Sequence, residues 1–179
     1  MAMRKLSLLL LAPLAIASAA TAVAQSREPV SALKGHNSNA PIDLVADRLE
    51  VQDRADRAMF SGNVRVKQDE LTLDTSRLTV AYSSSGGVQI KRLDASGGVT
   101  VRSPSETARG NFGIYDLDRK LITLVGDVVL QRQGSQLSGQ RLVIDLDSGR
   151  AVIDGGPAGV GQSGGRVTGH FTVPRRGGN

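Results

Sequence analysis

Residues 60–80 read FSGNVRVKQDELTLDTSRLTV, and this stretch decides the fold class. Apolar residues fall on every second position in it, not at the spacings of three and four that a helix needs. The short runs are separated by residues that favour turns. This pattern predicts an antiparallel sandwich, roll or barrel. The alternating positions are Phe60, Gly62, Val64 and Val66, then Leu71 and Leu73, then Leu78 and Val80.

The same alternation continues on both sides of this stretch. Upstream, the apolar positions of Ile42–Ala46 have one parity and those of Leu49–Val51 have the other. A strand cannot move its apolar side chains to the other parity without a bulge or bend. We therefore expect the chain to bend near Asp47–Arg48. Downstream, the alternating pairs are Val99 and Val101, then Phe112 and Ile114.

Four similar segments indicate that the chain is built from a repeat. Each starts with an apolar-x-apolar core, continues into a polar turn, and leads to a glycine after an apolar pair. Such self-similarity predicts a supersecondary unit, here a pair of strands, that stacks on its copies to bury one apolar face. We expect the glycines at positive φ or at close backbone approaches. The segments start at Arg48, Arg77, Asn111 and Arg141, and the glycines are Gly62, Gly97, Gly126 and Gly155.

The N-terminus has the pattern of a secretory signal peptide. Arg4 and Lys5 precede an apolar run, and small residues then lead to Ala22-Val23-Ala24, an A-x-A-like cleavage site. The run is shorter than the ~20 residues that cross a bilayer, which disfavours a membrane anchor. We therefore expect residues 1–24 to be removed and the rest to be exported.

The remaining chain divides into three segments. Residues 25–40 are polar and are expected to be loose, residues 41–154 form the alternating domain, and residues 155–179 are a Gly-rich segment with one last short strand and a basic tail. The formal net charge is +5. Because an exported chain rarely meets nucleic acid, this excess indicates a phosphate-bearing lipid or ordinary solubility, and no nucleic-acid partner.

Residues that carry out catalysis are scarce. The chain has no Cys, and the spacing of His36 and His170 does not suit a metal site. The Asp pairs within 116–118 and 145–147 follow strands, where Asp favours turns by bonding its own backbone. No phosphate loop or nucleophile elbow is present. We expect no catalytic residue, no metal and no cofactor, and so a binding protein and not an enzyme.

An apolar interior is the feature that could carry a function. Two facing sheets, splayed slightly open, would leave a gap lined by Leu, Val, Ile and Phe that could hold acyl chains. Basic side chains at the rim could meet phosphates. The rim candidates are Arg48, Arg65, Lys67 and Arg77, although a solvated strand face is the commoner role for each.

Three motifs resemble the LptA/OstA family. Pro41-Ile42-Asp43-Leu44-Val45-Ala46-Asp47 and Phe60-Ser61-Gly62-Asn63-Val64-Arg65-Val66 resemble its opening, and Leu124-Val125-Gly126-Asp127-Val128 resembles a later copy of its glycine motif. The resemblance covers residues 40–153. It implies a folded-over antiparallel β-jellyroll, built from short repeated strand pairs.

The resemblance also implies a function. Members of this family are periplasmic and carry lipopolysaccharide between the inner and outer membrane, with its acyl chains inside the jellyroll. They stack end to end as homo-oligomers and join LptC-like and LptD-like jellyroll domains, so that membrane association is through partners. A repeat with uncapped ends agrees with this, since an exposed sheet edge can pair with another strand.

Site residues carried over from the family are few. Ile42 matches a position close to bound lipid, Tyr115 matches an aromatic near the groove, and Phe60 is expected in the interior. The alternatives are a scaffold that joins jellyroll domains without binding lipid, a secreted enzyme, and an outer-membrane barrel, whose strands need ~9–11 residues. The lipid-binding candidates are Ile42, Leu44, Phe60, Val64, Val99, Val101, Phe112 and Tyr115.

Overall fold

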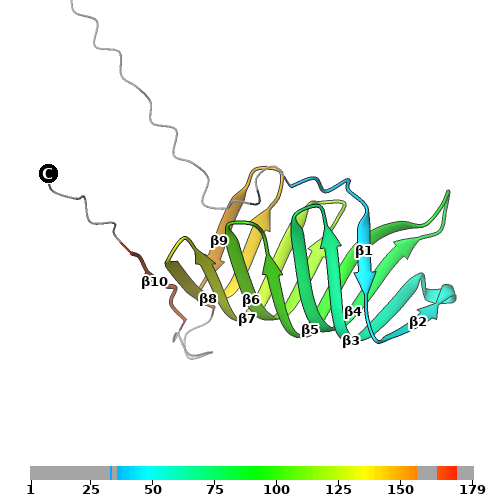
Figure 1. Ribbon diagram of the computed structural model, residues 1–179, viewed down its shortest axis with the longest axis horizontal. Coiled ribbons are helices and arrows are strands. Elements are labelled where there is room, and N and C mark those ends of the chain that lie inside the picture. The colour runs from blue at the N-terminus through cyan, green and yellow to red at the C-terminus, as the bar shows by residue number, and fades with distance from the viewer. Residues whose placement is uncertain (1–32, 34–35, 157–164, 173–179) are drawn as a thin grey trace, which may run out of the picture.

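The computed structural model describes residue 33, residues 36–156 and residues 165–172. These residues form ten strands and one 3₁₀ turn, η1 (Asp53–Ala55), and confirm the predicted all-β class (Figure 1). No helix in this section of the chain is long and apolar enough to cross a membrane. The expected signal peptide lies outside the described residues. The strands are β1 (Ile42–Val45), β2 (Arg48–Gln52), β3 (Arg57–Gln68), β4 (Leu71–Ser83), β5 (Gln89–Arg102), β6 (Glu106–Asp116), β7 (Leu121–Arg132), β8 (Ser135–Asp145), β9 (Arg150–Asp154) and β10 (Thr168–His170).

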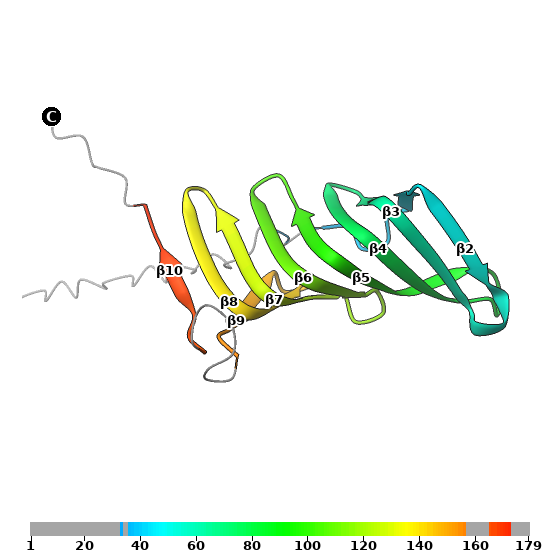
Figure 2. The ribbon, with the colours of Figure 1, turned by 90° about the horizontal axis from the view of Figure 1, so that it is seen from below.

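A single antiparallel sheet contains all ten strands and folds over on itself. Its order is β1-β3-β4-β5-β6-β7-β8-β10, while β2 also pairs with β3 and β9 with β8. β1 pairs with residues 65–68 of β3 and β2 with residues 57–61, so β3 belongs to two half-sheets. We call these the β1 half-sheet, which ends in β10, and the β2 half-sheet, which ends in β9. Figures 1 and 2 show β2 and β10 at opposite ends of this folded-over jellyroll.

The strands that cross both half-sheets are longer than the sequence pattern indicates. β3 to β8 contain between 11 and 14 residues each. Each pair of short alternating segments is one strand interrupted by a bulge, as the register shifts between residues 61 and 64 and between residues 125 and 128 show. A bulge bends a strand and increases its twist. One strand can therefore serve both half-sheets.

Glycines occupy these bulges. The predicted positive φ is confirmed at Gly62, Gly97 and Gly126, with values of 79°, 84° and 83°. At Gly126 a Cβ atom would also stand 2.8 Å from Nδ2 of Asn111 on the neighbouring strand. A larger residue there would adopt an unfavourable backbone angle and displace Asn111. Gly155 matches the other expectation, because its backbone closely approaches the segment before β10.

The four repeat copies correspond to the four hairpins of the β2 half-sheet, β2–β3, β4–β5, β6–β7 and β8–β9. The third copy, however, starts one residue later than the sequence pattern indicates, because Phe112 lies in the same cross-strand row as Arg77. A slip of one residue exchanges the two faces of a strand. Phe112 and Ile114 are 57% and 42% exposed on the outer face, whereas Tyr115 is 3% exposed. The prediction that Phe112 and Ile114 face the interior is wrong.

The predicted bend before residue 48 is confirmed as a break between two strands. β1 ends at Val45, and β2 begins at Arg48 in the other half-sheet. The backbone N–H of Asp47 donates to the carbonyl of Gly62 (2.9 Å), and the Asp47 carboxylate accepts from Nδ2 of Asn63 (2.9 Å). Asp47 therefore fastens this corner to the bulge of β3.

The core lies between the half-sheets and is aliphatic. Leu124, Val128 and Leu142 are completely buried. Burial of such side chains contributes roughly 1.5–3 kcal/mol each, as an upper estimate. The interior is less closed at the β2 end, where Leu49 and Val51 are each 54% exposed. One inward row crosses the β2 half-sheet through Leu49, Phe60, Leu78, Ala95, Gly113, Leu124, Leu142 and Ile153.

Candidate functional site

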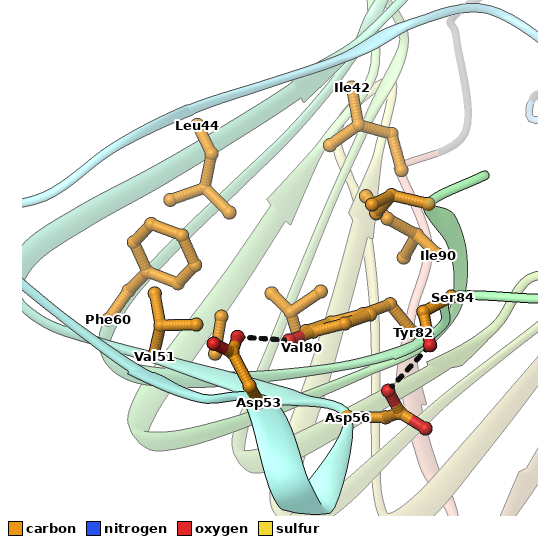
Figure 3. Close-up of a pocket in the computed structure, with 12 residues that line it drawn as sticks. Ile42, Leu44, Val51, Asp53, Asp56, Phe60, Val80, Tyr82, Ser84 and Ile90 are labelled. Carbon is orange, nitrogen blue, oxygen red and sulfur yellow. Dashed lines mark hydrogen bonds between the residues drawn. The ribbon is translucent and has the colours of Figure 1, made fainter.

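A pocket opens between the two half-sheets at the β1 and β2 end of the fold (Figure 3). Its volume is about 560 Å³. β1 contributes from one half-sheet, and β2 to β5 contribute from the other. A concave site with this lining suits an apolar ligand. The apolar lining residues are Ile42, Leu44, Val51, Ala58, Phe60, Val80, Val88 and Ile90.

Two apolar walls face each other across this pocket. Figure 3 shows Ile42 and Leu44 on one side and Phe60, Val80 and Ile90 on the other. Ile42 and Leu44 share one face of β1 because successive side chains of a strand point to opposite faces. A flexible apolar chain between these walls would be removed from water on both sides.

The polar side chains of the pocket lie at its mouth and are acidic or neutral. The Tyr82 hydroxyl donates to Oδ1 of Asp53 (3.4 Å), and the Ser84 hydroxyl donates to Oδ1 of Asp56 (3.1 Å). Both carboxylates come from the turn around η1. Partial desolvation, and then the negative charges of Asp53 and Asp56, raise the pKa of the Tyr82 hydroxyl. Tyr82 is therefore a neutral donor over the physiological pH range.

The basic side chains expected at the rim do not line this pocket. Arg48, Arg65, Lys67 and Arg77 all have the parity of the outer face, opposite to Leu49, Val64, Val66 and Leu78. The prediction of a basic rim at the pocket is therefore wrong, and the solvated strand face is the better description.

Arg65 instead belongs to an ion-pair cluster on the outer face. Its Nε lies 2.7 Å from Oδ1 of Asp74, and Arg102 bonds the same carboxylate. Burial raises the pKa of the Asp74 carboxyl, but the hydrogen bonds and charges of Arg65 and Arg102 outweigh this and leave the pKa below its usual value. Such partly exposed pairs contribute little to stability.

The eight lipid-binding candidates fall into three groups. Ile42, Leu44 and Phe60 come together in the pocket. Val64, Val99 and Val101 are 1–2% exposed and belong to the closed core. Tyr115 lines a small cavity next to the pocket, with Ile42 between the two spaces, and Phe112 lies on the outer face. Lipid contact by any of them stays a prediction.

Sequence reasoning missed most of the pocket. Val51, Val80 and Ile90 carry the expected alternation, but nothing local indicates that β2, β4 and β5 end at the same opening. Tyr82 and the η1 turn were missed because their contacts join residues far apart in sequence. One residue of the adjoining cavity could have been singled out from the sequence. Gln68 is a polar residue in the inward parity of Val64 and Val66, and it is only 2% exposed.

The Asp pairs have the predicted turn role. Oδ1 of Asp116 accepts from the backbone N–H of Arg119 (2.9 Å). Oδ1 of Asp145 accepts from the backbone N–H groups of Asp147 and Ser148, each at 3.0 Å, and these bonds hold the pKa of the Asp145 carboxyl below its usual value. In the described ranges, no three His, Asp or Glu side chains gather in a way that could hold a metal ion.

Residues 43–150 match the family model described as "LptA/(LptD N-terminal domain) LPS transport protein". This match spans more than half of the chain. The chain belongs to this family. This LptA-type assignment agrees with the structure. The motifs that resemble the family imply a folded-over antiparallel sheet, and such a sheet is observed.

One related sequence and one similar solved structure can be compared with this LptA-type chain. An uncharacterized protein of Rhizobium meliloti (strain 1021) is 34% identical over 148 residues, which cover 78% of this chain and 77% of the relative. The crystal structure of LptH from Pseudomonas aeruginosa, the LptA homologous periplasmic component of the lipopolysaccharide transport device, superposes with a TM-score of 0.64. It covers 76% of this chain and 98% of that chain at 18% identity, and so supports the fold.

Proposed function

We propose that this chain is a periplasmic lipopolysaccharide carrier and not an enzyme. The observation that carries the proposal is the apolar pocket between the half-sheets, in a chain of the LptA/(LptD N-terminal domain) family. Acyl chains occupy the pocket between Ile42 and Leu44 on one side and Phe60 on the other. Each buried methylene contributes about 0.8 kcal/mol.

The mechanism is passive. The pocket holds acyl chains by removing them from water, and the sugar portion of the lipid remains outside. The neutral and acidic mouth around Tyr82 and Asp53 offers hydroxyl and carboxylate groups that hydrogen-bond sugar hydroxyls. Energy for directional movement comes from elsewhere in the envelope, because a binding site by itself only lowers the free energy of the bound state.

A photo-crosslinking comparison of two phenylalanines tests this function. Phe60 lines the pocket, whereas Phe112 is 57% exposed on the outer face. A benzoyl-phenylalanine at position 60 should crosslink to lipopolysaccharide but not to its deacylated form, and the same group at position 112 should not crosslink. Equal crosslinking at both positions would mean that the pocket is not the specific lipid site. No crosslinking in a folded protein would favour the scaffold that joins jellyroll domains without binding lipid.

We further infer that copies of this chain stack end to end and join LptC-like and LptD-like jellyroll domains. Each half-sheet has two outermost strands, β1 and β10 in one and β2 and β9 in the other. Outermost strands carry backbone groups that can pair with a further strand. Stacking would place the open pocket of one copy against the β9 and β10 end of the next.

Light scattering over a range of protein concentrations tests the stacking. Mass should rise with concentration if the outermost strands pair between copies. Arg48→Pro in β2 should reduce this rise, because proline removes a backbone donor from an edge strand. A mass that stays at one protomer at every concentration would contradict the end-to-end assembly, while leaving lipid binding by the single copy intact.

A further inference from the structure

The small cavity next to the pocket is lined by a buried glutamine, Gln68. Gln68 is 2% exposed and lies at the end of β3, in the β1 half-sheet. A buried amide is costly unless its hydrogen bonds are made. The Gln68 amide is fully engaged: its Oε1 accepts from the Tyr115 hydroxyl (2.9 Å) and lies 3.1 Å from Nε2 of His36. Its Nε2 donates to the carbonyls of Ser38 (2.9 Å) and Ala40 (3.0 Å).

These bonds tie three regions of the fold together at one point. Tyr115 comes from β6 in the β2 half-sheet, so its bond to Gln68 joins the two half-sheets across the interior. The other bonds go to residues 36–40, which precede β1. Figure 1 shows this segment, in blue, crossing the open side of the fold on its way to β1. We call residues 36–40 the strap.

Leu33 is an apolar anchor upstream of the strap. Leu33 is 5% exposed and packs in the hydrophobic core, and its carbonyl accepts from the backbone N–H of His36 (3.1 Å). Within residues 36–40 themselves, the contacts to the end of β3 are hydrogen bonds to Gln68 and Asp69. A segment held mainly by hydrogen bonds opens at a lower free energy than the surrounding core.

Gln68, which holds the strap, lines the small cavity next to the pocket. Ile42 lines both the pocket and a small cavity whose other walls include Gln68, Leu93, Tyr115 and Ile122. Beyond these residues the interior is closed and aliphatic. An acyl chain that advances past Ile42 therefore enters a space lined by Gln68 and Tyr115, and Gln68 is the residue that holds the strap.

We propose that Gln68 latches residues 36–40 over the apolar interior and that acyl chains entering from the pocket displace this strap. The inference rests on the carrier function proposed above. The lipid site then has two compartments: the pocket at the β1 and β2 end, which is open, and a second space under the strap, which opens only when the bonds of Gln68 exchange. Gln68 and Tyr115 are positioning residues of this latch.

A single cysteine at position 33 reports on the strap. The chain has no Cys of its own, so the Leu33→Cys protein carries one thiol, and its reaction with a maleimide follows the opening of the segment. Lipopolysaccharide should raise the labelling rate at least about tenfold, because labelling tracks the open population. Ala108→Cys is the matched control, since Ala108 is 3% exposed in the core of β6 and should label slowly with or without lipid.

A second variant tests the latch without lipid. Tyr115→Phe removes the hydroxyl that bonds Gln68 and the side chain of Ser38 in the strap, and should speed the labelling of the cysteine at position 33 severalfold in lipid-free protein. Amide hydrogen exchange of residues 36–40 in the unaltered chain, with and without lipopolysaccharide, gives the same readout if the Leu33→Cys change itself loosens the strap.

The outcomes separate the two proposals. Bound lipopolysaccharide with unchanged labelling and unchanged exchange would overturn the displaceable strap and leave the carrier function standing. No binding of lipopolysaccharide by the folded protein would overturn the carrier function, and the lipid-driven displacement with it. Unchanged labelling in the Tyr115→Phe variant would show that the Tyr115 hydroxyl, through its bonds to Gln68 and Ser38, does not hold the strap.

Discussion

Ile42→Asp is expected to weaken lipopolysaccharide binding at least about tenfold, or about 1.4 kcal/mol. Ile42 projects from β1 into the pocket and faces the second apolar wall. An aspartate there would have to give up water when acyl chains fill the space, and a desolvated charge is costly without a partner. Ile42 is only partly buried in the lipid-free protein, so the fold should persist. Equilibrium binding of lipopolysaccharide, followed by fluorescence, measures the change.

Val45→Asp is the matched control for this substitution. Val45 lies on the same strand, β1, but is 68% exposed on the opposite face. The introduced charge is the same, whereas the pocket is untouched. Binding by the Val45→Asp protein should equal that of the unaltered chain. If the two variants lose affinity equally, the pocket is not where the acyl chains bind.

Leu124→Ala is expected to lower the free energy of unfolding by roughly 2–5 kcal/mol. Leu124 is completely buried in β7, and a typical domain has a stability of only about 5–15 kcal/mol. Its cross-strand neighbour on β6 is Gly113, whose missing Cβ would stand 3.1 Å from Cδ2 of Leu124. Gly113 has no side chain that could move into the space, so the cavity should stay open. Urea unfolding followed by circular dichroism measures the loss.

The adjacent Val125→Ala provides the comparison. Val125 follows Leu124 in β7 but is 41% exposed on the outer face. Its truncation should change stability by about 0.5 kcal/mol or less. A similar loss in both proteins would mean that the interior at Leu124 is not packed as the structure describes.

Much of the fold follows from local physics that a sequence displays. Alternation gives the face of each strand, and the glycines before Asn63, Gly98 and Asp127 mark where the strands bend, because only glycine adopts their backbone angles without strain. The parity change before Arg48 likewise predicts the corner between β1 and β2. These features need no knowledge of which strands are neighbours.

The candidate site was less predictable, because it depends on which strands end together. Ile42 and Phe60 were found through the family resemblance and Leu44 through its alternation with Ile42. Val80 and Ile90 join them only through the pairing of β4 and β5. The parity of the basic residues, by contrast, was already visible in the sequence. Arg65 alternates with Val64 and Val66 and must face outward if they face inward.

The bulges have a consequence for how the molecule opens. They lie next to one another across β3, β4, β5, β6, β7 and β8, so that they form one crease over the whole sheet. Neighbouring strands are hydrogen-bonded on both sides of this crease, and no strand can change its angle alone. The two half-sheets are therefore joined along one stiff line of bulges. Increasing the angle between the half-sheets requires concerted changes in every strand. The hairpin turns and the strap, which lie away from the line of bulges, can move individually.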